Sequence, residues 1–349
     1  MTIRDLEFYL VEIPCYGREA PVRSMLVRLA TDAGLEGWGE AQSGWRASEL
    51  APRRDALLPV LAGRSVFDVE ELLEQDALQP HPVRSAVEMA CWDLVGRLAG
   101  QPLCHLFGGA YRQRIPLAVR LAGAQGSQIA PLARELADQG FHSQIIASCG
   151  QPDRDLQMLA AVREAAGERV EFRFDAGANY DLETARELCA ELEPDALQFL
   201  LDPLESHELD QIASLRRQTN VPLGVWRAIR GPADMLALVR CGAAPFVVVD
   251  LGLVGGIAPA RRTAAIAQAA GVSASLGGGP SVGIAAAAML QLAASTPAFT
   301  GCNECADHQL EDDVLVRPLE IVDGMITAPR APGLGVEVDR AKVERYQVA

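Results

Sequence analysis

Hydrophobic and polar positions follow one pattern in roughly the first third of the chain and a different pattern beyond it. Strand-like alternation covers residues 3–11, 23–30 and 34–41, and the sequence DAG predicts a turn between the last two stretches. Helical periodicity follows over residues 48–62 and 68–76, and most clearly over VRSAVEMACWDLVGRLAG. Three strands followed by helices predict an α+β domain in this part of the chain.

From about Ile115, short apolar runs alternate with helical stretches of roughly 10–15 residues. The runs are PLAVRLAG, SQIIAS, VEFRFDAG, ALQFLLDP, PLGVWR, PFVVVDLG, VSASLGG and AFTGCNE. Eight strands alternating with helices favour a closed parallel barrel over an open doubly wound sheet, and no GxGxxG motif opens the first helix. Beyond Pro318, LEIVDGMITAP and APGLGVEV predict a strand and a glycine-rich segment that return to the first domain.

Charged residues follow three consecutive apolar runs, one strand-plus-helix unit apart: Asp175, Asp202 and Arg227. In a parallel barrel the C-terminal ends of the strands face a common mouth, where the chemistry is done. Carboxylates gathered there repel one another unless a cation lies among them. The pattern therefore predicts a charge-balanced site. Further candidates at strand ends are Arg120, Ser148, Cys149, Asp250, Ser275 and Glu304.

Composition narrows the class of protein. Of the 349 residues 49% are hydrophobic and 22% charged, which is typical of a soluble globular protein. The net charge of −15 argues against nucleic acid and anionic membranes as partners. Eight scattered cysteines and the absence of a basic and then apolar leader in MTIRDLEFYLVEIP favour a reduced, cytoplasmic protein. Lys342 is the only lysine, so no lysine of the central region can act as a base.

Three motifs carry a resemblance to a known family. AVEMACWDLVGRLAGQPLCHLFGG, DLGLVGGI and PGLGVEVD resemble the enolase superfamily, in its mandelate racemase and muconate lactonizing enzyme branch. The resemblance implies an α/β fold: a modified, TIM-like (β/α)-barrel with an N-terminal α+β capping domain that the C-terminal segment completes. On this basis we expect the capping domain at residues 1–112, the barrel at 113–318 and the returning segment at 319–349.

The resemblance also implies a chemistry. Family members abstract a proton α to a carboxylate with a lysine or histidine base, and Mg²⁺ held by three strand-end carboxylates stabilises the resulting enediolate. Asp175 and Asp202 fall at two of the metal-ligand positions. The third falls at Trp226 or Arg227, and neither offers the oxygen donors that Mg²⁺ needs. The usual base positions read Ile145, Ala147 and Leu276.

Site residues follow from these matches. We expect Asp250, Arg227 and Glu304 to be catalytic. We expect the substrate to be a small anionic carboxylate, held by Arg120, Ser275, Arg18 and Arg46. His207 falls at a helix start, where a solvent-facing role is expected. The resemblance further implies a homo-oligomer.

Three hypotheses about function stay open at this point. In the first, the protein is an enzyme that racemises, epimerises or dehydrates a carboxylate, with Arg227 replacing the metal charge. In the second, it is an inactive family member that binds a ligand or assembles with itself. In the third, Mg²⁺ is held by shifted ligands, Asp175 and Asp202 with Asp250 or Glu205. The cofactor is accordingly either Mg²⁺ or none.

Overall fold

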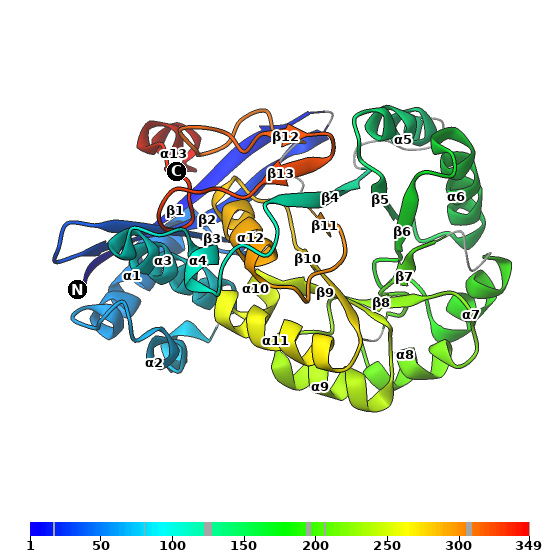
Figure 1. The fold of residues 1–349 in the computed structure, drawn as a ribbon, viewed down its shortest axis with the longest axis horizontal. Coiled ribbons are helices and arrows are strands. Elements are labelled where there is room, and N and C mark those ends of the chain that lie inside the picture. Colours follow the sequence, from blue (N-terminus) through cyan, green and yellow to red (C-terminus); the bar gives the residue numbers. More distant parts are fainter. Residues whose placement is uncertain are drawn as a thin grey trace.

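The computed structural model describes residues 1–16, 18–79, 81–121, 128–192, 197–205, 207–304 and 309–348, but not the side chains of Arg18 and Glu19. An N-terminal α+β domain lies against a barrel of strands with helices on its outside (Figure 1). The predicted fold, a modified (β/α)-barrel with an N-terminal capping domain, is confirmed.

The capping domain is built on an antiparallel sheet in the order β1-β2-β3. Its strands are β1 Ile3–Cys15, β2 Arg18–Thr31 and β3 Glu36–Ala41, and its helices are α1 Ala47–Leu61, α2 Val69–Leu73, the 3₁₀ turn η1 Asp76–Leu78, α3 His81–Ala99 and α4 Leu103–Leu106. The turn between β2 and β3 lies where DAG predicted it, and Gly34 adopts the left-handed conformation there with φ +76°. One apolar side of the sheet packs against α1 and α3 to form a separate core.

β3 packs unusually close to α3, because two of its residues have no side chain. A Cβ added at Gly39 would lie 1.9 Å from the carbonyl oxygen of Ala86 in α3, far inside contact distance. Glycine is therefore required at this position. The close approach fixes the position of the neighbouring Glu40, whose side chain extends from the capping domain to the barrel.

Eight parallel strands form the barrel. They pair in the order β10-β9-β8-β7-β6-β5-β4, and β11 pairs with β4 and contacts β10 to close the ring. The strands are β4 Arg114–Arg120, β5 Ser143–Ala147, β6 Glu171–Asp175, β7 Phe199–Leu201, β8 Leu223–Val225, β9 Phe246–Asp250, β10 Ser273–Gly277 and β11 Asn303–Glu304. The helices are α5 Ile129–Asp138, α6 Pro152–Ala166, α7 Leu182–Glu191, α8 Leu209–Arg216, α9 Pro232–Cys241, α10 Leu251–Val254, α11 Ile257–Ala269 and α12 Ile284–Ser295.

Helix α12 contains the alanine-rich stretch of the sequence. Nearly all of its residues are buried, and it contacts β3 and α4 of the capping domain as well as β4 of the barrel. Its apolar surface is therefore satisfied within the protein. In the part of the chain that the structure describes, no helix is long and apolar enough to cross a membrane.

The C-terminal segment joins both domains. Strands β12 Ile321–Val322 and β13 Met325–Thr327 form a hairpin, and β13 pairs antiparallel with β4 of the barrel, not with the capping sheet. The segment reaches the capping domain only afterwards, through backbone bonds at Gly333 and Val348 and through helix α13 Arg340–Tyr346 beside β1. The last residues of the chain thus lie beside β1 (Figure 1).

Three buried carboxylates of the capping domain bind backbone N–H groups outside it. Glu40 accepts from the N–H groups of Val282 and Ala285 at the start of α12, at 2.6 and 2.8 Å. Glu88 accepts from the first N–H groups of α11, and Asp93 accepts from Leu334 in the C-terminal segment at 2.9 Å. The bonds of Glu40 and Glu88 satisfy helix-start donors that would otherwise be buried without partners. They hold the capping domain in one position over the barrel mouth.

Glu88 makes this connection sensitive to pH. Burial raises its pKa from 4.5 to about 7, against the opposing effect of the N–H groups of Ala258, Ile257 and Trp92. Between these pH values the folded protein binds a proton that the unfolded chain does not, so this contribution to stability falls as pH rises. Glu88→Gln removes the titration. We expect the difference in unfolding free energy, wild type minus variant, to fall by up to about 1.4 kcal/mol per pH unit between pH 4.5 and 7.

Urea unfolding at several pH values measures this difference. The matched control is Glu74→Gln, an exposed glutamate at the end of α2, for which the difference stays flat. A flat difference for Glu88→Gln as well would show that Glu88 is not protonated in the folded protein near neutral pH.

Candidate active site

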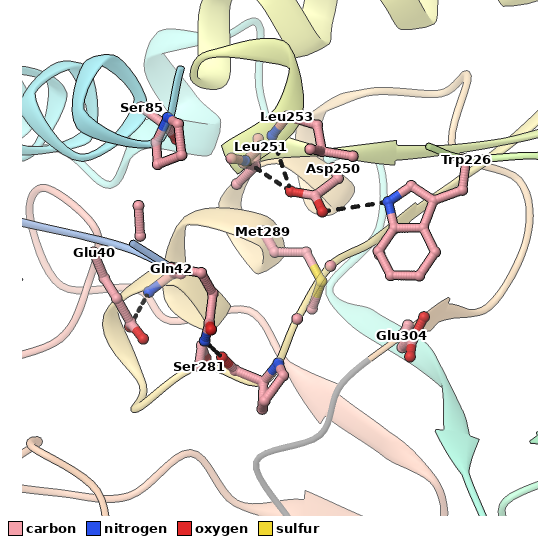
Figure 2. Close-up of a pocket in the computed structure, with 18 of the residues that line it drawn as sticks. Glu40, Gln42, Ser85, Trp226, Asp250, Leu251, Leu253, Ser281, Met289 and Glu304 are labelled. Carbon is pink, nitrogen blue, oxygen red and sulfur yellow. Dashed lines mark hydrogen bonds between the residues drawn. The ribbon is translucent and has the colours of Figure 1, made fainter. Parts of the chain in front are cut away.

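A cavity of about 560 Å³ lies between the barrel mouth and the capping domain. Figure 2 shows Glu40, Gln42 and Ser281 on one side of it and Trp226, Asp250 and Glu304 on another. The capping domain also contributes Ser85 and Met89 from α3, while Leu251, Leu253 and Met289 add apolar surface from the barrel. Such a half-open and largely apolar hollow with a few converging polar groups is typical of a small-molecule site.

At the floor of the cavity, one guanidinium connects two strand ends. Nη1 of Arg227 lies 3.1 Å from Oδ1 of Asp175 and 2.8 Å from Oδ2 of Asp202, and Nη2 lies 3.3 Å from Oδ2 of Asp175. Both aspartates are buried, at 3% and 2% exposure. The same guanidinium lies 4.4 Å from the ring centre of Trp226, a cation–π contact that further fixes its plane. The predicted cluster of these three charged residues is present in the structure.

A second arginine extends the cluster. Nη1 of Arg120 lies 2.9 Å from Asp175, and its Nε lies 2.9 Å from Glu304 at the end of the last barrel strand. Burial opposes ionisation of Asp175, but Arg120 and Arg227 outweigh it and hold the pKa of Asp175 below its ordinary value. The mouth therefore contains a continuous alternation of acid and guanidinium across the ends of five strands. It needs no further cation to keep Asp175 ionised.

Asp202 is held by the backbone as well. It adopts a left-handed conformation with φ +42°, which is uncommon for a residue with a side chain. Its carboxylate accepts from the N–H groups of Trp226 at 2.8 Å and Arg227 at 3.0 Å. Both oxygens are thus already bonded within the protein.

Asp250 ends β9 and lies apart from the ion-pair cluster. Its Oδ1 accepts from the N–H groups of Gly252 at 2.8 Å and Leu253 at 3.3 Å at the start of α10, and its Oδ2 accepts from Nε1 of Trp226 at 3.3 Å (Figure 2). Burial outweighs these bonds, and the proximity of Glu304 acts in the same direction, so the pKa of Asp250 is raised. A carboxylate with a raised pKa is a stronger base than an ordinary aspartate.

The donor set does not fit Mg²⁺. Arg227 already pairs with Asp175 and Asp202, while the oxygens of Asp250 bond to α10 and Trp226. No group of three histidine, cysteine or acidic side chains that could hold a metal is found among the described residues, which include Asp250 and Glu205. The interpretation with shifted ligands therefore has no support in the geometry.

Several predicted substrate contacts lie elsewhere. β10 extends to Gly277, which pairs with Asp250, so the mouth end of this strand is glycine and not Ser275. Ser275 lines a different hollow near the opposite end of the barrel. Arg46 is exposed at the start of α1 and does not line the cavity, and the side chain of Arg18 lies outside the described residues. Arg120 is connected to the site by its ion pairs with Asp175 and Glu304.

The structure also adds residues that sequence reasoning missed. His207, between β7 and α8, lines the cavity instead of facing solvent alone, and so does Arg230 on the loop after β8. Glu40 and Gln42 reach the cavity from the capping domain. A glutamate next to two glycines in GWGE was a usable signal, because the glycines indicate close packing. The loop residues carried no signal.

Charged strand ends beneath a cavity roofed by an N-terminal α+β domain define the class of capped (β/α)-barrel proteins. Comparison with family models narrows this class. Residues 18–108 match the mandelate racemase / muconate lactonizing enzyme N-terminal domain, and residues 128–342 match the enolase C-terminal domain-like family. The chain therefore belongs to the mandelate racemase and muconate lactonizing enzyme branch of the enolase superfamily.

Individual relatives agree with this assignment. The chain is 26% identical to muconate cycloisomerase 1 of Rhodococcus opacus over 92% of its own length and 90% of that protein. It resembles the crystal structure of an isomerase from Streptomyces coelicolor at a TM-score of 0.89 and 28% identity, covering 99% of this chain and 98% of the other. The N-succinyl Arg/Lys racemase of Bacillus cereus shares the fold at a TM-score of 0.92 and 23% identity, covering 100% and 99%.

If Arg227 occupies the place of a cation ligand, replacing it by an acid creates an acidic cluster that attracts a divalent ion. Arg227→Glu places a third carboxylate beside Asp175 and Asp202, and their mutual repulsion favours cation binding. We expect the variant to bind Mn²⁺ at least about tenfold more tightly than the wild type, a difference of about 1.4 kcal/mol. Electron paramagnetic resonance of free Mn²⁺ measures this binding.

Arg230→Glu is the matched control, because it changes the same charge within the same cavity but away from the two aspartates. Equal Mn²⁺ binding by both variants would show that the gain comes from the change in net charge of the cavity and not from the position of Arg227. Stoichiometric Mg²⁺ in purified wild-type protein that resists dialysis would contradict the role assigned to Arg227.

Proposed function

We propose that the protein is an enzyme that removes the α-proton of a small carboxylate substrate, with the guanidinium of Arg227 as the positive charge beside the developing enolate. The observation that carries the proposal is the position of Arg227, between Asp175 and Asp202 and at the wall of the cavity. The products would be those of racemisation, epimerisation or dehydration. The names of its relatives refer to muconate and to N-succinylated arginine and lysine, which supports a carboxylate as substrate.

Arg227 has donors to spare. A guanidinium has five N–H groups, and its bonds to Asp175 and Asp202 use the two of Nη1 and one of Nη2. The N–H of Nε and the second N–H of Nη2 have no acceptor among the described residues. Because the side chain is 31% exposed and lines the cavity, these two donors can face a substrate oxygen. A planar pair of donors suits a carboxylate, and a preorganised donor is strongest where negative charge develops.

Asp250 is the proposed base. Its Oδ2 has a single long bond to Trp226 and lies at the cavity, while Oδ1 is fixed by α10. Gly278 keeps space beside it, since a Cβ there would lie 3.5 Å from the carboxylate. In the proposed step Asp250 takes the proton from the α-carbon, and the electron pair moves onto the substrate carboxylate. Delivery of a solvent proton to the opposite face of the α-carbon completes racemisation or epimerisation, and departure of a hydroxyl from the neighbouring carbon as water, with the proton held by Asp250, completes dehydration.

The rest of the cavity supports binding. Arg230 lines the same cavity as Arg227 and adds positive charge for an anionic group, and His207 lines it as well. Met89, Met289 and Leu251 form an apolar wall suited to the carbon skeleton of the substrate. The proposed substrate is thus a carboxylate with an apolar part.

Proton exchange in D₂O tests the proposal without knowledge of the natural substrate. Incubation with a panel of amino acids, their N-acyl derivatives and acid sugars should give deuterium incorporation at the α-carbon of at least one compound, detected by NMR. We expect Asp250→Asn to reduce this rate by about 10²–10⁴-fold, because it removes the base. Asp210→Asn, an exposed change on α8, should leave the rate unaltered.

The pH dependence provides a second measure. Since the base must be ionised, the exchange rate should rise with pH through an inflection above the ordinary aspartate pKa of 3.8. Exchange that persists in Asp250→Asn would assign the base to another residue. Absence of exchange across the panel, combined with calorimetric binding of one of its members, would favour an inactive, ligand-binding protein.

A further inference from the structure

A third arginine of the barrel interior forms no ion pair with any residue that the structure describes. Arg173 lies in the middle of β6, two residues before Asp175, and its exposure is 2%. Its Nε donates to Oε1 of Gln198 at 2.6 Å, and its guanidinium lies 5.1 Å from the ring centre of Phe199. No acceptor in the described part of the chain bonds to its terminal Nη atoms. Arg173 thus differs from Arg120 and Arg227, which both pair with buried acids.

These Nη atoms border a hollow that is separate from the cavity at the mouth. It measures about 180 Å³ and lies near the amino ends of the strands, since its lining includes Gln198 before β7, Ser273 at the start of β10 and Thr300 before β11. Ser275 completes a set of three hydroxyl groups around it. None of these hydroxyls bonds to another group in the part of the chain described here. The hollow is far larger than the 10–15 Å³ or so that one water needs.

The charge of Arg173 is left largely uncompensated by the surrounding acids. Glu304 lies on the side of Arg173 that faces the barrel mouth, but its carboxylate pairs with Arg120. Glu171 lies at the amino end of the same strand and is exposed. Its carboxylate accepts a hydrogen bond from Nε2 of Gln198, so the amide of Gln198 separates it from the guanidinium. Burial lowers the pKa of Arg173, while Cys302, Glu304 and Glu171 act weakly in the opposite direction. A buried cation without a partner is costly, and buried charges are normally paired.

We propose that this hollow binds a small inorganic oxyanion such as phosphate, held by the Nη groups of Arg173 and by the hydroxyls of Ser273, Ser275 and Thr300. A guanidinium with hydroxyl donors around it matches the several acceptor oxygens of a tetrahedral anion. Gly301 makes room for the ligand. A Cβ at this position would lie 3.3 Å from Nη2 of Arg173 and 3.3 Å from Ser275, within the space that the anion would use. This site is independent of the reaction proposed for the mouth.

Calorimetric titration with inorganic phosphate at constant ionic strength tests the proposal on the full chain. We expect saturable binding at one site in the wild type. Arg173→Met removes the charge but keeps the length of the side chain, and binding should be lost. Arg217→Met, an exposed arginine after α8, is the matched control and should bind as the wild type does. Thermal unfolding should show the same pattern: phosphate raises the midpoint for the wild type and the control only.

A second variant keeps the proposal testable if Arg173→Met does not fold. Gly301→Ala retains the arginine but fills part of the hollow, and it should weaken phosphate binding at least tenfold. Binding that survives in both variants, or a wild type that shows no saturable binding, would overturn the proposal. Binding that is lost in Arg230→Met but kept in Arg173→Met would place the anion at the mouth, and the proposal would also be wrong.

Discussion

Three carboxylates are buried together at the barrel mouth, and two guanidinium groups lie among them. Asp175, Asp202 and Glu304 are each less than one-tenth exposed, and carboxylates buried to this degree require compensating charge. Arg227 and Arg120 meet this requirement with planar, permanently charged groups that contact two acids each. The arrangement fixes the ends of five strands relative to one another. It also determines which cation a substrate meets.

A guanidinium and a divalent ion neutralise the same acids but differ in what they offer a substrate. A divalent ion concentrates charge on one atom and polarises a bound oxygen directly. Arg227 spreads a single charge over three nitrogens, and two of its five donors are left for a ligand. Under the proposed function, an enolate would receive less stabilisation here than from a metal. Substrates whose α-protons are already acidic would therefore suit this site best.

The sequence predicted the parts of the molecule that depend on local periodicity. The eight strand runs and the positions of Asp175, Asp202 and Arg227 at their ends follow from apolar patterns that stop at a charge. Ser275 was misplaced because the strand continues to Gly277, and a glycine gives no apolar or polar signal at a strand end. Arg230 reaches the cavity from a loop, whose path depends on tertiary packing. That Arg173 forms no ion pair with a described residue could not be predicted, because this depends on which acids pair with Arg120 and Arg227 in the folded protein.

The buried carboxylates of the capping domain contact the barrel and the C-terminal segment through backbone N–H groups. Glu40 and Glu88 accept from N–H groups that open α12 and α11, and almost any residue at those positions presents the same donor. The roof of the cavity is therefore insensitive to most substitutions in the barrel beneath it. This separation would allow residues at the mouth to change while the position of the capping domain over the cavity stays the same. In such a protein, side chains at the barrel mouth can be replaced without loss of the backbone contacts that position the capping domain.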